Sequence, residues 1–453
     1  MTFFEELNQI IPKKQISKNQ TLLEQHSRDE SYHQPCLPEA VVFPASTAEV
    51  SEIMKLAARH QMPVVPFGYG SSLEGNIIPY SGGISLDFSL MNNIITLREN
   101  DFLVTVQPGV TRSQLNKELK KYGMFFSVDP GADATLGGMA ATNASGTSAV
   151  RYGIMRDQVR DMEVVLADGM VIHTGSLAAK SSSGYNLNGL FVGSEGTLGI
   201  FTELTLRIHG ISEHTLAARA SFQTLDESVQ AVISLLQAGI PIARVELVDE
   251  ESMKQINRYS ETDYPEGPTL FLEFHGNKEG LKQDVALTKE LMDDHHCSAL
   301  HFESDTAAMN RLWEARHHVA YAYIHNHQGK KQMVTDVCVP ISEMSGAIRD
   351  ARKAVEASGL PGGIVGHVGD GNYHIILMVD PENREDLQQA DKVNEHIVTY
   401  ALERGGTCTG EHSVGVGKKK YQEKEHGDAL LVMRKLKQAL DPNGILNPGK
   451  VLP

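Results

Sequence analysis

Cysteine is scarce in this chain: Cys36, Cys297, Cys338 and Cys408 are the only four among 453 residues. No two of them have the spacing of a metal knuckle or of a CxxC redox pair. We therefore expect neither a disulfide framework nor an iron–sulfur site. The few cysteines are typical of a protein from a reducing compartment. We expect each cysteine to be a small buried side chain.

Positive charge and long apolar runs are also scarce. There are 41 Lys and Arg against 57 Asp and Glu, a formal net charge of −16. This balance argues against nucleic acid or an anionic membrane as the main partner. No apolar run approaches the ~20 residues of a membrane span, and Met1–Leu7 lacks the basic-then-apolar pattern of a signal peptide. We expect a cytoplasmic protein and leave a peripheral membrane contact open.

Helical and strand patterns alternate along the whole chain. A capping box at Ser46 and Glu49 predicts a helix that begins there. Turn residues between strand patterns predict hairpins over 94–106 and 162–173. In the second half we expect helices at 342–357 and 382–404 around a strand pair over 363–379. This mixture favours an α+β fold over a parallel doubly wound sheet.

Three runs rich in small residues stand out in the first half. The first is Pro66-Phe-Gly-Tyr-Gly-Ser-Ser-Leu-Glu-Gly-Asn76. Its glycines can turn backbone N–H groups onto an anion, and its serines add hydroxyl donors, as a diphosphate requires. It is neither a GxGxxG loop that opens a helix nor a Walker loop. Taken alone, it could equally be a plain glycine-rich turn.

The other two runs favour a large flat ligand. One extends from Asp129 to Gly146 and is followed by Arg151-Tyr-Gly153, and the other is Gly193-Ser-Glu-Gly-Thr-Leu-Gly-Ile200. Side chains this short make a poor core but allow close backbone packing against a ligand. Three such loops within about 130 residues predict an extended cofactor.

In order and spacing, these loops resemble the FAD-binding domain of the vanillyl-alcohol oxidase and p-cresol methylhydroxylase superfamily. The resemblance implies FAD contacts in all three runs and near the C-terminus. One departure is Tyr69, which stands where that superfamily often has glycine. No His or Cys lies in 66–76 or 129–153, so we expect noncovalent FAD. The implied contacts are Pro66, Gly68, Tyr69, Gly70, Ser71, Ser72, Gly75, Asn76, Pro130, Gly131, Thr135, Gly137, Gly138, Thr142, Gly146, Tyr152, Glu195, Ile200 and Asn447.

The second half contains a candidate metal site. His367 and His374 flank Gly369-Asp-Gly371, a tight-turn sequence that would bring both imidazoles to one end of a hairpin. Two neutral imidazoles suit Zn²⁺, Mn²⁺ or Fe²⁺. Glu411 would complete a His₂Glu set with an open position. Without the adjoining Gly-Glu-His, such a pair would more often be a structural or surface pair.

These motifs resemble the D-lactate dehydrogenase and glycolate oxidase FAD-subunit family. The resemblance extends from about residue 40 to the C-terminus, and Thr335-Asp-Val-Cys-Val-Pro340 looks most like the cytochrome-type D-lactate dehydrogenases. It implies that Arg316 grips the substrate carboxylate and that His412 is the general base. Ser413 departs from the family, whose members usually have Gly at that position.

The resulting hypothesis is oxidation of a D-2-hydroxy acid, foremost D-lactate, to the 2-oxo acid. The metal would acidify the hydroxyl, His412 would take its proton, and hydride would pass to flavin N5. A quinone, a cytochrome or an electron-transfer flavoprotein would then accept the electrons. D-2-hydroxyglutarate or glycolate as substrate, a noncatalytic partner subunit, and a flavin-free metallohydrolase remain alternatives.

The sequence predicts three regions. Residues 1–37 form a helical leader, 38–212 a p-cresol methylhydroxylase-type FAD-binding domain, and 213–453 an α+β substrate and metal domain with a C-terminal helical segment. The oligomeric state, including a homodimer, is left open.

Overall fold

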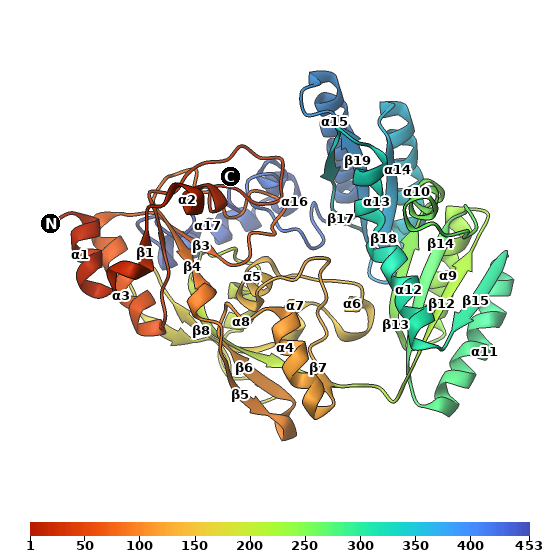
Figure 1. Cartoon of the computed structure of the whole chain (residues 1–453), viewed down its shortest axis with the longest axis horizontal. Helices are drawn as coiled ribbons and strands as arrows, with labels where there is room; N and C mark the ends of the chain where they lie inside the picture. The colour runs from red at the N-terminus through yellow and green to blue at the C-terminus, as the bar shows by residue number, and fades with distance from the viewer. The chain divides into compact units, whose positions relative to one another are not determined.

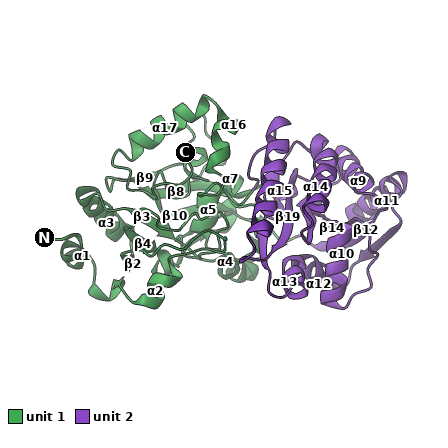
Figure 2. Cartoon of the chain, turned by 90° about the horizontal axis from the view of Figure 1, so that it is seen from above, with its two compact units in different colours: residues 1–145, 153–211, 411–453 green, residues 146–152, 212–410 purple.

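The computed structural model describes all 453 residues, and they divide into two compact units (Figure 2). Unit 1 comprises 1–145, 153–211 and 411–453, and unit 2 comprises 146–152 and 212–410. None of the helices has the length and apolar character that a membrane span requires. All four cysteines are free, but only Cys408 is buried and the other three are half-buried. The expectation that every cysteine is buried is therefore wrong for three of them.

Unit 1 contains a four-stranded sheet in the order β1 (Ile16–Ser17), β2 (Ala40–Val42), β4 (Ile84–Asp87), β3 (Val64–Phe67). Strands β2, β4 and β3 pair in parallel and form a small parallel sheet within the α+β fold. The reason is that α3 (Thr47–His60) connects β2 to β3 and supplies the crossover that parallel pairing needs. Apolar residues of α1 (Phe3–Ile10) and α3 are buried in one core with those of the sheet. Ser46 caps α3 as predicted.

The second sheet of unit 1 is antiparallel and has five strands. Both predicted hairpins are confirmed, as β5–β6 and as β8–β9. Its strands, in sheet order, are β5 (Ile94–Arg98), β6 (Leu103–Val106), β10 (Ile200–Arg207), β8 (Val159–Val165) and β9 (Val171–His173). A second core lies on it, under α4 (Arg112–Leu119), α5 (Leu136–Thr142), α7 (Met155–Gln158) and α8 (Leu187–Phe191).

Unit 2 is built on one large sheet between two layers of helices (Figure 2). The strands run in the order β15 (Ala299–Glu303), β12 (His214–Ser221), β14 (Thr269–Gly276), β13 (Ile242–Val248), β18 (Gly362–His367), β19 (Asn372–Val379), β16 (Lys331–Val334), and β17 (Val337–Cys338) also pairs with β19. One layer contains α9 (Leu225–Gln237), α11 (Lys278–Asp294), α14 (Met344–Ser358) and α15 (Arg384–Glu403). The other contains α10 (Glu250–Ser260), α12 (Thr306–His317) and α13 (Val319–Asn326).

The last segment of the chain packs with unit 1. It includes α16 (Gln422–His426) and α17 (Ala429–Leu440). Ile445 and Leu446 are buried in the same core as β3 and β4, and Val64 N–H donates to Ile445 O at 2.8 Å. The mixed α+β class is confirmed (Figure 1). Residues 411–453 pack with unit 1, whereas the predicted third region, 213–453, grouped them with the residues of unit 2.

Candidate active site

The first glycine run leaves the end of β3, where Pro66 lies, and packs closely on the second run. A Cβ atom at Gly68 would collide with Thr135 Oγ1, so only glycine permits this approach. Gly70 and Gly75 have φ of +80° and +72°, a region that favours glycine. The Tyr69 side chain is 61% exposed, so the larger residue does not fill the loop.

The second run forms the start of α5. Thr135 precedes the helix, and its hydroxyl accepts a hydrogen bond from Gly138 N–H at 3.3 Å. A Cβ atom at Gly137 would lie 2.5 Å from Pro108 Cβ, so this glycine is also a close approach. Thr142 ends the helix and donates to Gly138 O at 3.2 Å. Pro130 and Gly131 lie in the loop before it.

Three predicted FAD contacts, Asn76, Glu195 and Asn447, bond to one another inside unit 1. Asn76 Nδ2 donates to Glu195 Oε2 at 2.6 Å, and Asn447 Nδ2 donates to Glu195 O at 2.7 Å and to Asn76 O. Glu195 also accepts from Val414 N–H and Gly415 N–H at 2.8 and 2.9 Å. Burial raises the pKa of Glu195 against these hydrogen bonds. The network joins the third run to the segment that follows His412.

Ser413 has the left-handed backbone that glycine favours, with φ of +65°. Its hydroxyl accepts from Asn76 Nδ2 at 2.7 Å and donates to His412 O at 2.5 Å. These two bonds offset part of the cost of a side chain at this position. The departure from the family's glycine therefore leaves the turn in place.

The remaining predicted FAD contacts are divided between the units. In unit 1, Ser71 and Ser72 lie in the first run, and Ser72 Oγ donates to Asp29 Oδ2 at 3.0 Å. Ile200, also in unit 1, is the buried first residue of β10. Gly146 and Tyr152 belong to the short segment 146–152 of unit 2. There Tyr152 Oη lies 3.0 Å from His275 Nδ1, and His275 Nε2 lies 2.6 Å from Glu273 Oε1.

Two of the three predicted metal ligands, His367 and His374, meet in unit 2. His367 ends β18, His374 is the third residue of β19, and the hairpin pairs His367 with Asn372 and Val365 with His374. The ring centroids are 5.4 Å apart. His374 Nδ1–H donates to Thr335 O at 3.1 Å, and His367 Nδ1–H donates to Glu246 Oε1 at 2.6 Å. In both rings the lone pair of the neutral imidazole is therefore on Nε2, the donor that a metal needs.

Arg316, the predicted carboxylate clamp, reaches the same group of residues from the last turn of α12. It is 8% exposed, and its Nη2 donates to Glu246 Oε2 at 2.6 Å. Its buried Nε has no hydrogen-bond partner in the protein. A buried donor of this kind is costly unless a ligand satisfies it. Arg316 thus has an available donor in a site that also contains His367.

Glu246 is the residue that sequence reasoning missed. It is fully buried on β13. Burial by itself would raise its pKa, but the Arg316 guanidinium and the hydrogen bonds from His367 and Arg316 hold the pKa of Glu246 below its ordinary value. The available signal was the pair Arg244 and Glu246, two charges that alternate within an otherwise apolar strand.

Asp336 holds the two residues that precede Glu411 and His412 in the chain. This fully buried carboxylate accepts from Asn372 Nδ2 at 2.7 Å, from Thr409 Oγ1 at 2.6 Å and from Gly410 N–H at 2.8 Å. It also lies 3.6 Å from His374 Nδ1. Gly410 is the last residue of unit 2, and Glu411 and His412 follow it directly in the chain.

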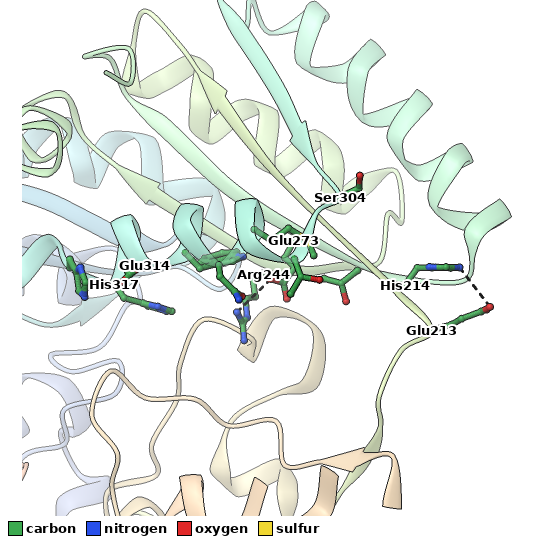
Figure 3. Close-up of a pocket in the computed structure, with 13 residues that line it drawn as sticks. Glu213, His214, Arg244, Glu273, Ser304, Glu314 and His317 are labelled. Atoms are coloured by element: carbon green, nitrogen blue, oxygen red, sulfur yellow. Dashed lines mark ion pairs between the residues drawn. The ribbon is translucent and has the colours of Figure 1, made fainter. Parts of the chain in front are cut away.

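A separate surface pocket of about 790 Å³ lies in unit 2. Figure 3 shows Arg244, Glu273 and His317 among its lining residues, with ion pairs dashed. Arg244 and Glu273 approach to 3.6 Å. None of the predicted site residues lines this pocket, so we assign it no part in the site.

Comparison with known proteins gives the family. The model of FAD linked oxidases, C-terminal domain, matches residues 211–451, and that of an FAD binding domain matches 38–175. A probable mitochondrial D-lactate dehydrogenase of Danio rerio is 44% identical over 441 residues, which cover 96% of this chain and 89% of that protein. A mitochondrial D-lactate dehydrogenase (cytochrome) of Arabidopsis thaliana is 40% identical over 457 residues, 98% and 81% of the two chains.

The fold has a close counterpart among solved structures. The crystal structure of p-cresol methylhydroxylase with substrate bound matches with a TM-score of 0.81 at 18% identity, covering 99% of this chain and 96% of that one. The predicted p-cresol methylhydroxylase-type FAD-binding fold is confirmed.

The chain belongs to the FAD-linked oxidases. It is an FAD-linked oxidoreductase, and the resemblance to the D-lactate dehydrogenase and glycolate oxidase family is confirmed. The first glycine run fits the cofactor, since Tyr69 points largely to solvent and the loop contains two glycines with positive φ.

Proposed function

We propose that this protein oxidises a D-2-hydroxy acid, foremost D-lactate, to the 2-oxo acid. The observation that carries the proposal is the buried Arg316 beside the histidine pair, with an unsatisfied Nε donor. A guanidinium can bind a carboxylate through two parallel hydrogen bonds. The relatives named above as D-lactate dehydrogenases support D-lactate as the acid.

In this proposal Arg316 binds the substrate carboxylate and sets which face of the α-carbon meets the flavin. His412 takes the proton from the substrate hydroxyl oxygen as the general base. His367, His374 and Glu411 hold a divalent metal, Zn²⁺, Mn²⁺ or Fe²⁺. When bound, the metal supplies Lewis-acid polarisation and the FAD supplies the two-electron acceptor.

The placement of Glu411 and His412 is supported by the chain on either side of them. Asp336 holds Thr409 and Gly410 in unit 2, and Glu195 holds Val414 and Gly415 in unit 1. Each flank of this short segment is thus hydrogen-bonded to a buried carboxylate of its own unit. Such order suits residues that must keep catalytic geometry.

FAD is proposed to bind noncovalently, because runs 66–76 and 129–153 offer no His or Cys for attachment. The three predicted regions, 1–37, 38–212 and 213–453, are retained as the modular division of the sequence. Electrons would pass to a quinone, a cytochrome or an electron-transfer flavoprotein. A homodimer remains part of the proposal.

The proposed location is the cytoplasm or the surface of a membrane facing it. Four free cysteines support a reducing compartment. The two relatives above are named as mitochondrial proteins. Fractionation of the host cell would decide the location of this one.

The test is an anaerobic titration followed at the visible flavin band. D-lactate, L-lactate, glycolate and D-2-hydroxyglutarate are added to separate samples, with and without EDTA pretreatment. We expect D-lactate to bleach the band, EDTA to abolish bleaching, and added Zn²⁺ or Mn²⁺ to restore it.

The other outcomes separate the alternatives. Faster bleaching by D-2-hydroxyglutarate or glycolate would change the substrate. Bleaching that EDTA does not affect would contradict the metal. A yellow protein that no acid bleaches would favour a noncatalytic partner subunit, and a colourless one would favour the flavin-free metallohydrolase.

A further inference from the structure

Glu246 contacts both the proposed metal site, at His367, and the proposed carboxylate clamp, Arg316. Strands β13 and β18 are antiparallel neighbours with Leu247 opposite Gly366, a register that places Glu246 beside His367. Arg316 reaches the same carboxylate from α12, 70 residues away in sequence. One fully buried side chain therefore contacts a proposed metal ligand and the proposed carboxylate clamp.

Each oxygen of Glu246 has its own partner. Oε1 accepts from His367 Nδ1 and Oε2 accepts from Arg316 Nη2, both at 2.6 Å. Because the two oxygens belong to one rigid carboxylate, a movement that shortens one bond also moves the other oxygen. Charge-assisted bonds of this length orient both partners strongly.

Resting on the proposed function, we propose that Glu246 is a positioning residue that couples metal binding at His367 to carboxylate binding at Arg316. It keeps the lone pair of His367 on Nε2 and turns the remaining donors of Arg316 to the substrate. Binding of the metal at His367, or of the carboxylate at Arg316, then favours the arrangement that the other residue needs. By thermodynamic linkage, the metal and the carboxylate each strengthen the binding of the other by the same factor.

The test is the substitution Glu246→Gln in the FAD-loaded protein. An amide keeps the shape but loses the charge and one acceptor. The affinity for Zn²⁺ is measured by competition with a chromophoric chelator, with and without saturating pyruvate, which cannot react with oxidised flavin. In the wild-type protein we expect pyruvate to tighten Zn²⁺ binding by about 5- to 150-fold.

In the Glu246→Gln variant we expect Zn²⁺ affinity to fall by about 10- to 100-fold and the effect of pyruvate to approach unity. KM for D-lactate should rise together with the loss of metal. A Glu246→Gln variant that keeps the full wild-type effect of pyruvate on Zn²⁺ would overturn the proposal. If this variant loses its fold, Glu246→Asp replaces it, because it keeps the charge but shortens the reach. Its pyruvate effect should also shrink, and an unchanged effect would overturn the proposal.

Glu273 offers a matched control. It is also buried on the sheet, and its carboxylate likewise approaches one histidine and one arginine, His275 and Arg244. Neither partner is a proposed metal ligand or clamp. Glu273→Gln should therefore leave Zn²⁺ affinity and the effect of pyruvate unchanged. Equal losses in both variants would mean that any buried carboxylate on this sheet matters, which overturns the specific role of Glu246.

The two proposals fail in different ways. If the wild-type protein binds no Zn²⁺, or if D-lactate does not bleach its flavin, the proposed function fails. If the wild-type protein binds Zn²⁺ and is bleached but shows no effect of pyruvate on Zn²⁺, only the coupling through Glu246 fails.

Discussion

Buried charges in this protein are matched by specific partners, and the kind of partner differs between sites. Glu246 faces an arginine and a histidine, and the pKa of its carboxyl is lowered. Glu195 faces an amide and two backbone N–H groups, and burial raises the pKa of its carboxyl. The difference follows because a guanidinium partner stabilises a carboxylate more than neutral donors do. Glu246 therefore suits alignment of Arg316 and His367, and Glu195 suits holding backbone.

The proposed base gives a prediction for a single residue. His412→Ala should lower the rate of flavin reduction by D-lactate by about 10²- to 10⁴-fold, the usual contribution of a general base. FAD content should not change, because no glycine run contains His412. Stopped-flow absorbance measures the rate, and the ratio of visible to ultraviolet absorbance measures the FAD.

An exposed histidine provides the comparison. His396 pairs with Asp350 at the surface. D-lactate should therefore reduce the flavin of the His396→Ala variant at the wild-type rate. If His412→Ala also reaches that rate, another group is the base.

At the scale of elements, the hairpin β18–β19 sets the distance between His367 and His374, the two proposed imidazole ligands. Its turn includes Gly371, which has φ of +91°, and a Cβ atom there would collide with Val339 O. Gly371→Ala should therefore destabilise the protein by about 1–3 kcal/mol or more, the cost of such backbone strain. It should also lower Zn²⁺ affinity because the two imidazoles would move apart.

Urea unfolding and the chelator competition measure the two effects. Gly276→Ala is the control within unit 2, since its Cβ would meet only Leu281 at 3.5 Å, an ordinary contact. Similar losses in the two variants would contradict the role of the turn.

The hairpin also shows what the sequence could predict. Its strands, its turn and the approach of His367 to His374 are local, because only six residues separate the histidines and the turn residues lie among them. The capping of α3 and the hairpins β5–β6 and β8–β9 were predictable for the same reason.

Contacts between distant segments could not be predicted. Glu246 meets His367 across 121 residues, and nothing near Glu246 in sequence identifies that partner. The parallel pairing of β2, β4 and β3 likewise depends on how α3 packs. Among the proposed FAD contacts, Asn76 and Asn447 are 371 residues apart, so only the folded chain reveals that they bond to each other.

At the scale of the whole molecule, each unit has its own buried core. The two cores of unit 1 share no residue with the core that lies under α10, α12 and α13 in unit 2. We therefore expect two unfolding transitions in urea. Added FAD should raise the midpoint of the unit 1 transition only, because the proposed cofactor loops lie largely in that unit.

The sequence supplies a natural probe for this experiment. Trp313 is the only tryptophan, and it is buried in the core of unit 2. Its fluorescence should follow unit 2, while flavin release follows unit 1. Coincident transitions that both shift with FAD would show that the two units unfold together.

The return of residues 411–453 to unit 1 has a consequence for synthesis on the ribosome. Unit 2 is nearly continuous in sequence and can complete its sheet once residue 410 has emerged. The parallel sheet of unit 1 must wait, because Val64 bonds to Ile445 and its core includes Leu446. The FAD-binding unit begins first and finishes last, so its early strands remain without their final partners while most of the chain is made.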